Sequence, residues 1–306
     1  MGGRQEADKR ALVAELGSLS LEFTRLSQLT GKHKYFDAVQ RITNHFDMQQ
    51  NQTKIPGLFP IQVNALDENF ALGDTFTFGG MADSLYEYFP KQYMLLGGLV
   101  DQYKNLYERA IEAAKVHLFF RPLHPENEDL LISGTVGSHG LQPEGQHLSC
   151  FVGGMVAIGA KIFNRTDELD ISRKLVDGCI WAYDSMPTGI MPELFHVIPC
   201  KESEDCVWST ERWNQAVLTE SRSTETTDPT DIIKDDRLPP GYTKITDRRY
   251  ILRFVPSSFL SSSSSPNIRS IVPKPSNRYS YYIVLPVTAH SRTLPGACLP
   301  PFRMPP

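Results

Sequence analysis

The stretch FGGMADSLYEYFPKQY, residues 78–93, places two carboxylates and four aromatic residues in a helical pattern directly after a glycine pair. Asp83 and Glu87 are four residues apart, which is about one helical turn. Asp83 could be the N-cap of this helix, with Glu87 favouring the same terminus from a solvated face. Alternatively, the two could form half of an active site, because carboxylates among aromatic side chains often act in acid–base chemistry.

Residues 78–93 belong to a series of helical segments that come in pairs. Each pair closes over a short polar or glycine turn, and the pairs recur about every 65 residues. The expected helices are residues 7–31, 33–49, 83–96, 99–119, 147–163 and 167–186. The first carries an apolar stripe through Leu19, Phe23 and Leu26, and it stops at Gly31, a favourable residue just beyond a helix C-terminus.

Loops rich in Pro and Gly, with short β-prone runs, separate the helical pairs. This alternation fits an all-α fold, either a helical solenoid or an α/α toroid whose long loops gather at one face and build a pocket there. Three hairpins do not close a ring of six or seven. We therefore expect a partial toroid of helical hairpins with irregular loops and short β-hairpins.

The overall composition excludes several classes of protein. Of the 306 residues, 41% are hydrophobic and 22% charged, which is ordinary for a soluble globular protein. A net charge of −4 favours neither a nucleic-acid binder nor a membrane-surface binder. No window approaches 18 consecutive apolar residues, and the N-terminus is charged where an export signal needs an apolar core. We expect no transmembrane segment or signal in this chain.

Residues 254–306 differ in composition from residues 1–253. They contain none of the 35 acidic residues but 10 of the 22 prolines, together with the run SSFLSSSSSP. Such a segment buries too little apolar surface to offset its chain entropy. We expect a disordered tail that originates from mis-spliced or read-through sequence.

Two further carboxylates and one cysteine pair are candidates for a function. Glu22 falls among expected core positions of the first helix, where Arg25 could be its partner. Glu193 follows a proline in an apolar loop, which makes it a pocket candidate. Cys150 and Cys179 fall on the two helices of one hairpin, so a disulfide between them is sterically reasonable.

The other cysteines and one histidine allow fewer conclusions. Cys200 and Cys206 could close a second, small loop, and two disulfides would suit an oxidising compartment. His147 and Cys150 superficially suggest metal ligands, but no second pair completes a tetrahedral zinc site. Two N-glycosylation sequons begin at Asn51 and Asn164, and such triplets also arise by chance.

Five segments resemble, in order and spacing, those of the class I α-1,2-mannosidases, glycoside hydrolase family 47: AELGSLSLEFTRLSQLTG, GGMADSLYEYFPKQY, HLSCFVGGMVAIGA, TGIMPELF and DRRYILR. The resemblance covers about residues 8–253. It implies a barrel of seven helical hairpins and a monomeric, calcium-dependent, inverting enzyme. Such an enzyme removes α-1,2-linked mannose from high-mannose N-glycans in the secretory pathway. Met81, where the endoplasmic-reticulum branch tends to have Arg, favours the Golgi and secreted fungal branch.

The resemblance also implies roles for individual residues. Asp83 matches the catalytic aspartate and Glu193 an acidic residue of the same pocket, so both are expected to be catalytic. Inverting hydrolysis needs an acid and a base roughly 6.5–9.5 Å apart. On this interpretation Asp83 and Glu87 are half of a site rather than a helix cap. The residues expected to bind substrate are Glu22, Glu87, His147 and Arg253, and Cys150 with Cys179 matches the family disulfide.

The chain also departs from the family pattern. The motif FETxIRxLGG, which supplies a glutamate used as an acid, is missing, and RYILR continues into FVPSSF instead of PExxES. The threonine that helps to hold calcium is absent too. We therefore expect a truncated product or gene model that lacks about three hairpins, binds no calcium and is not catalytic as written. The alternatives are a non-catalytic glycan-binding relative and a helical-repeat scaffold that binds protein.

Overall fold

A computed structural model describes residues 6–200, 206–221 and 228–251 of the chain. The chain divides into two units, Met1–Arg253 and Phe254–Pro306, and all of the described residues belong to the first. Arg253 and the expected tail lie outside the described residues, so the expectations about them stay predictions.

The described residues form helices and short strands in alternation. The α-helices are α1 (Val13–Gly17), α2 (Ser20–Thr30), α3 (Lys34–Gln49), α4 (Asp83–Leu95), α5 (Asp101–His117), α6 (Phe151–Ile162), α7 (Glu168–Asp184), α8 (Thr210–Ser221) and α9 (Pro229–Asp235). The 3-10 helices are η1 (Gln50–Gln52) and η2 (His147–Cys150). The strands are β1 (Ala11–Leu12), β2 (Gln62–Val63), β3 (Phe76–Thr77), β4 (Phe119–Phe120), β5 (Ile132–Ser133), β6 (Thr135–Gly137), β7 (Gly140–Gln142), β8 (Glu144–Gln146), β9 (Leu194–Val197) and β10 (Tyr242–Asp247).

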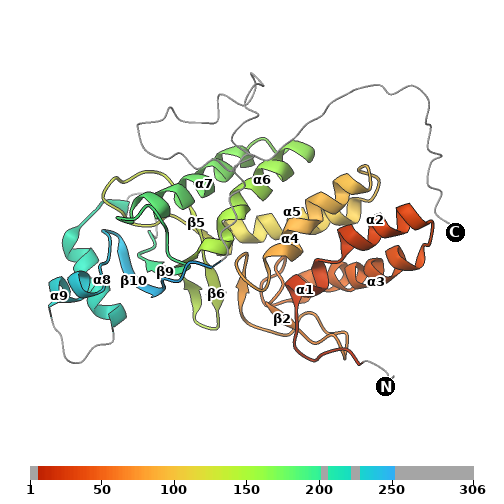
Figure 1. Cartoon of the computed structure of the whole chain (residues 1–306), viewed down its shortest axis with the longest axis horizontal. Coiled ribbons are helices and arrows are strands. Elements are labelled where there is room, and N and C mark those ends of the chain that lie inside the picture. Colours follow the sequence, from red (N-terminus) through yellow and green to blue (C-terminus); the bar gives the residue numbers. More distant parts are fainter. Residues whose placement is uncertain (1–5, 201–205, 222–227, 252–306) are drawn as a thin grey trace. The chain divides into compact units, whose positions relative to one another are not determined.

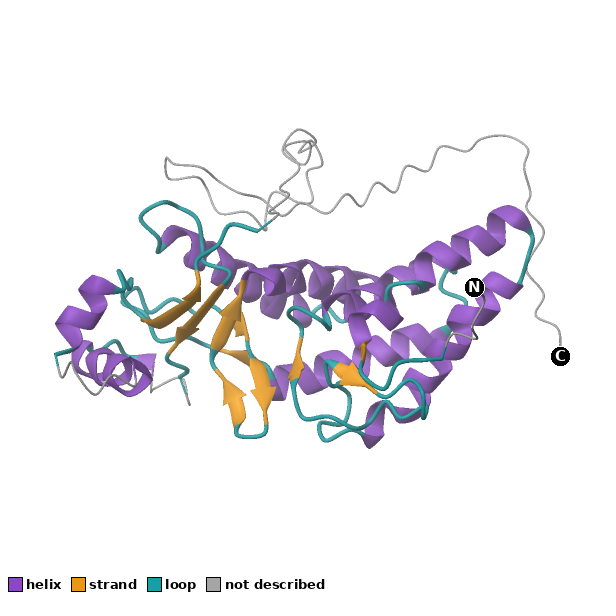
Figure 2. Cartoon of the chain, turned by 60° about the horizontal axis from the view of Figure 1, so that its bottom comes forward, coloured by secondary structure: helices purple, strands orange, loops and turns teal. Residues whose placement is uncertain are grey.

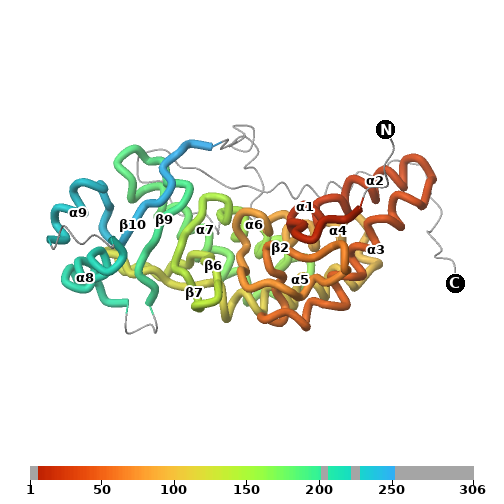
Figure 3. The backbone as a smooth tube through the Cα atoms, turned by 90° about the horizontal axis from the view of Figure 1, so that it is seen from below, coloured from red at the N-terminus to blue at the C-terminus, as the bar shows by residue number. Residues whose placement is uncertain are grey.

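Six of the helices pack as three hairpins, α2 with α3, α4 with α5, and α6 with α7 (Figure 1). Figure 3 follows the backbone through these hairpins to β9, α8, α9 and β10. The six helices expected from the sequence are confirmed, although the first begins only at Val13 and is divided into α1 and α2, and the fifth begins with the 3-10 helix η2. Gly31 ends α2 in the left-handed region, with φ 67°, and its amide donates to the carbonyl of Ser27.

The expected core face of the first helix is wrong. In α2 the buried residues are Ser20, Thr24 and Ser27, whereas Leu19 just before it and Leu26 within it are about two-fifths exposed. The reason lies on α4, where the fully buried Gln92 needs a polar partner and donates from Nε2 to Thr24 Oγ1 at 2.7 Å. The small polar face of α2 therefore packs toward α4.

The remaining helices bury the apolar faces that their sequences predict. Val39 and Phe46 of α3 lie in the core, and Phe46 packs edge-on against Phe59 with ring centroids 4.8 Å apart. A main core joins α1 and α3 to α6. A second core, around Trp181 and Tyr242, joins α7 and α8 to the strands β9 and β10.

The strands form small antiparallel sheets, drawn in orange in Figure 2. Two sheets have three strands, with the orders β3-β6-β7 and β10-β9-β8. In the second of these, Gln146 at the end of β8 pairs with Leu194 at the start of β9. This register brings η2, which follows β8, beside the loop that precedes β9. Among the described residues, no helix is long and apolar enough to cross a membrane.

Candidate active site

Asp83 is the first residue of α4, one position later than an N-cap. Ala82 occupies the N-cap position and makes no side-chain cap hydrogen bond, so the helix-cap interpretation of Asp83 is wrong. Asp83 Oδ1 instead accepts a hydrogen bond from the amide of Ser84 at 2.8 Å. Burial raises the pKa of Asp83 above its usual value, and the charge of Glu87 adds to the increase. These two effects outweigh the lowering by the Ser84 hydrogen bonds.

Glu87 and Glu22 each accept a hydrogen bond from a side chain of α4. Glu87 accepts from Lys91 Nζ at 2.5 Å, one helical turn further on. Glu22, on α2, is exposed and accepts from the hydroxyl of Tyr88 at 2.9 Å. Partial burial of Tyr88, its hydrogen bond to Glu22 and the charges of both glutamates raise its pKa to about 12. The expected Glu22–Arg25 pair is therefore replaced by a pair with Tyr88.

The aromatic residues of the opening stretch do not form a sugar-binding surface as a group. Tyr86 and Phe89 are buried in the main core, and Tyr86 donates to the carbonyl of Phe59 at 3.3 Å. Tyr93 packs against Phe163 with centroids 5.0 Å apart. Among the aromatic residues of this stretch, Tyr88 hydrogen-bonds to an expected substrate-binding residue, Glu22.

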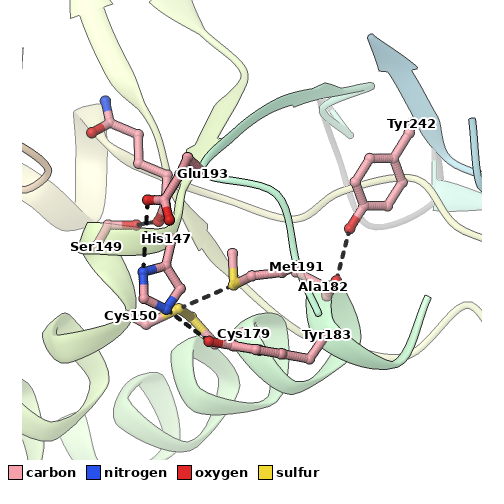
Figure 4. Close-up of a disulfide and its surroundings, with 10 residues drawn as sticks. His147, Ser149, Cys150, Cys179, Ala182, Tyr183, Met191, Glu193 and Tyr242 are labelled. Atoms are coloured by element: carbon pink, nitrogen blue, oxygen red, sulfur yellow. Dashed lines mark hydrogen bonds and ion pairs between the residues drawn. A yellow bond between two sulfur atoms is a disulfide. The ribbon is translucent and has the colours of Figure 1, made fainter. Parts of the chain in front are cut away.

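Glu193 and His147 form a second group of candidate residues, shown in Figure 4. Glu193 is only 8% exposed, and its Oε2 lies 3.9 Å from Nδ1 of His147. The other ring nitrogen, Nε2, lies 2.7 Å from the hydroxyl of Tyr183. The imidazole is thus held between a carboxylate and a phenol.

The backbone holds Glu193 from both sides. Its amide donates to the carbonyl of Asp247 at 2.9 Å, and its carbonyl accepts from the amide of His147 at 2.9 Å. The amide of Ile251 lies 3.4 Å from Glu193 Oε1. The segment after β10 therefore passes beside this carboxylate and then leaves the described residues just before Arg253.

A hydrogen bond joins the segments that carry the two groups. The amide of Gly80, three residues before Asp83, donates to Oε1 of Gln146, the residue before His147, at 3.0 Å. A Cβ at the neighbouring Gly79 would lie 2.1 Å from the same Oε1. The glycine pair before α4 thus permits close approach of β8 to the start of α4.

The described residues contain two disulfides. Cys150 and Cys179 are bonded across η2 and α7, beside His147 and Tyr183 (Figure 4). Cys200 is bonded to Cys206 six residues further along the chain. The first fixes the end of η2 to the helix that also carries Tyr183.

Comparison with known proteins assigns the chain to a family. Residues 2–260 match the sequence profile described as Glycosyl hydrolase family 47. The chain belongs to glycosyl hydrolase family 47. The resemblance found in the sequence is thereby confirmed.

Relatives within family 47 come from both animals and fungi. The "Endoplasmic reticulum mannosyl-oligosaccharide 1,2-alpha-mannosidase" of Rattus norvegicus is 36% identical over 184 residues, 60% of this chain and 27% of the relative. The "Probable mannosyl-oligosaccharide alpha-1,2-mannosidase 1B" of Neosartorya fischeri is 36% identical over 185 residues, 60% of this chain and 37% of the relative. The chain thus spans well under half the length of these relatives. Because the rat and the fungal relative are equally identical to this chain, these identities do not place it nearer to the endoplasmic-reticulum branch or to the fungal branch.

A solved family 47 structure shares the fold. The "alpha-1,2-mannosidase from Trichoderma reesei" superposes with a TM-score of 0.59 at 24% identity, over 80% of this chain and 57% of that one. The all-α architecture of helical hairpins, part of an (αα)7 barrel, is therefore confirmed.

Family 47 enzymes depend on calcium. In the described ranges, no group of three or more His, Cys, Asp or Glu side chains could hold a metal ion.

Sequence reasoning missed Tyr183 as a member of the candidate site. It lies on α7, one residue after the buried Ala182, and its pairing with His147 depends on the packing of α7 beside η2. A local signal would have been weak, because a tyrosine on a hairpin helix is most often a core residue.

Proposed function

We propose that this chain carries the substrate site of a mannosyl-oligosaccharide 1,2-alpha-mannosidase, with high-mannose N-glycans as the substrate class. The relatives of this name and the family membership support the reaction class. The single observation that carries the proposal is the Glu193–His147 pair. A carboxylate that is 8% exposed and lies 3.9 Å from an imidazole nitrogen is a typical acid–base arrangement.

Asp83 and Glu193 have the different surroundings that an acid and a base require. Burial raises the pKa of Asp83, which is the direction of shift that suits a group that donates a proton to the leaving oxygen. Glu193, beside His147, would take a proton from the attacking water. In an inverting reaction, the water adds to the anomeric carbon as the glycosidic bond breaks, and each carboxyl acts once.

Glu22, Glu87, His147 and Arg253 are proposed to bind the sugar. The carboxylates of Glu22 and Glu87 offer acceptors for mannose hydroxyls, and Tyr88 and Lys91 orient them. The imidazole of His147 is oriented in the same way by Tyr183. Arg253 is included on the sequence resemblance alone.

We further propose that the protein acts in the secretory pathway as a monomer without nucleic-acid partners. Two disulfides favour an oxidising compartment, and the rat relative is named for the endoplasmic reticulum. The absence of bound calcium and of hydrolysis by this chain stays a prediction from the sequence.

The test is calorimetric titration of the 306-residue chain with α-1,2-mannobiose and with α-1,3-mannobiose. The proposal expects binding of the α-1,2 isomer in clear preference to the α-1,3 isomer, and it is wrong if neither isomer binds. Mannose released from the same samples, with and without calcium, checks the expectation that the chain is not catalytic. Hydrolysis would contradict that expectation but not the proposed substrate.

A further inference from the structure

The turn between α6 and α7 presents the second sequon, Asn164-Arg165-Thr166, on the surface. Asn164 is exposed and adopts the left-handed conformation, with φ 57°. The amide of Arg165 donates to the carbonyl of Ala160 at 2.9 Å, a bond that closes the end of a helix when the residue before the donor is left-handed. Asparagine tolerates this conformation better than most residues. The geometry therefore fixes Asn164 at the tip of a hairpin.

The middle residue of the sequon anchors the turn. Arg165 Nη2 lies 2.6 Å from Oε1 of the fully buried Glu168, and it also contacts Glu112 on α5. Arg165 Nη1 lies 3.7 Å from Glu108 Oε1. Because the guanidinium group is drawn toward α5 and α7, the side chains on either side of it are left at the surface.

The acceptor amide and the hydroxyl of this sequon are both accessible. Thr166 is exposed, and its contact in the turn is made by its backbone carbonyl, which accepts from Leu169 at 3.2 Å. Within the described residues, the side chains of Asn164 and Thr166 make no hydrogen bond that would have to break.

The first sequon, Asn51-Gln52-Thr53, is different. Thr53 is 6% exposed, and its hydroxyl donates at 2.7 and 2.8 Å to the carbonyls of Ile55 and Leu58. Its hydroxyl is thus accessible only before this part of the chain folds, although Asn51 itself is exposed. The two sequons therefore allow a sequon with an exposed hydroxyl to be compared with one whose hydroxyl is buried, in the same chain.

We propose that Asn164 is an N-glycosylation site and that its acceptor turn stays available after folding. In this reaction the Nδ2 of Asn164 forms a bond to the anomeric carbon of an oligosaccharide carried on a polyprenyl diphosphate. The bond from that carbon to the diphosphate oxygen breaks, the polyprenyl diphosphate leaves, and the amide loses one proton. The host's membrane transferase performs the step. The proposal rests on the chain entering the secretory pathway, as proposed above.

The experiment directs the full 306-residue chain into the endoplasmic reticulum of yeast with a cleavable leader. Peptide:N-glycosidase treatment in heavy-oxygen water then converts each glycosylated Asn to labelled Asp, which peptide mass spectrometry locates. We expect label at position 164 in most copies, and less label at position 51 than at position 164. Unlabelled Asn164, or label confined to Asn51, would overturn the proposal.

Two variants complete the test. Asn164→Asp keeps a residue that tolerates the left-handed conformation but removes the acceptor amide, so its label should be lost completely. Thr166→Ser keeps the hydroxyl and should keep the label. The double variant Asn164→Asp with Asn51→Gln should carry no N-glycan. A mass shift on peptide:N-glycosidase treatment of this double variant would overturn the assignment. Because the leader delivers the chain whatever its native compartment, failure here is distinguishable from failure of the proposed function.

Discussion

His147 and Glu193 are joined twice, once through the backbone and once through their side chains. The amide of His147 donates to the carbonyl of Glu193 at 2.9 Å, and Nδ1 of the imidazole lies 3.9 Å from Oε2 of the carboxylate. The register of β8 with β9 imposes the first contact, because Gln146 pairs with Leu194. The position of this side-chain pair is thus set by the sheet rather than by a flexible loop.

Tyr183 orients the imidazole of this pair. Tyr183→Phe removes a hydroxyl 2.7 Å from His147 Nε2 while keeping the ring. We expect binding of α-1,2-mannobiose to weaken by roughly fivefold, since a hydrogen bond contributes about 1 kcal/mol. Calorimetric titration measures the change. Unaltered binding would show that Tyr183 does not position His147 for the sugar.

Replacement of Asp83 by Asn should stabilise the fold at neutral pH. Burial raises the folded-state pKa of Asp83 above 3.8, so ionisation costs the folded state free energy as the pH rises through the window above 3.8. Asn removes this cost, and its side-chain oxygen still accepts from Ser84. After allowance for solvent screening, we expect a gain of less than about 1 kcal/mol at pH 7.

The pH dependence of the stability gain distinguishes the cost of ionising Asp83 from other causes of a stability change. The gain for Asp83→Asn should shrink as the pH falls toward 3.8, where the carboxyl of the parent chain is protonated in the folded state. Urea unfolding at several pH values measures it. Asp37→Asn, at an exposed ion pair with Arg41 on α3, is the control and should change the unfolding free energy little. A destabilised Asp83→Asn variant at pH 7 would refute the account of Asp83.

Glu168 should be essential for stability, in contrast to its neighbour Glu112. Glu168 is fully buried and accepts from Arg165 and from Lys115, the latter at 3.2 Å. Glu168→Gln keeps an acceptor oxygen but removes the buried negative charge that balances these cations, and we expect a loss of about 3 kcal/mol. Glu112→Gln removes a half-exposed carboxylate from the same cations and should cost less than about 1 kcal/mol. Urea unfolding curves compare the two, and equal losses would contradict this account.

Gly178 on α7 should not tolerate a methyl group. In most helices Gly→Ala stabilises by about 1 kcal/mol. Here a Cβ would lie 2.0 Å from the backbone carbonyl oxygen of Leu131, so either α7 or the segment before β5 must move. We expect Gly178→Ala to lower the free energy of unfolding by about 2 kcal/mol. A stabilised variant would show that this contact is looser than described.

The hairpins could be predicted from sequence because helical periodicity is a local signal. The C-terminus of α2 at Gly31 and the apolar face of α3 at Val39 and Phe46 follow directly from the residues. The buried face of α2 could not be predicted, because Thr24 is buried by the requirement of Gln92 on another helix.

Short β-hairpins were expected, but the positions of the strands and helix α9 were not predicted. The strands are two to six residues long, and pairing with distant partners fixes them, as Tyr242 of β10 pairs with Val197 of β9. Helix α9 did have a local signal, since Asp228 caps it by accepting from Thr230 and Pro229 begins it. At the site, Glu193 and His147 were expected in one pocket, but their 3.9 Å contact depends on the β8–β9 register.

The most direct test of the central claim is calorimetric titration of α-1,2-mannobiose into the parent chain and into Glu193→Gln. Asp37→Asn serves as the control, because its carboxylate is exposed on α3. The account predicts that the parent and Asp37→Asn bind alike, whereas Glu193→Gln, which loses the charge 3.9 Å from His147, binds at least about tenfold more weakly. Equal binding by all three chains would contradict the assignment of Glu193 to the mannose site.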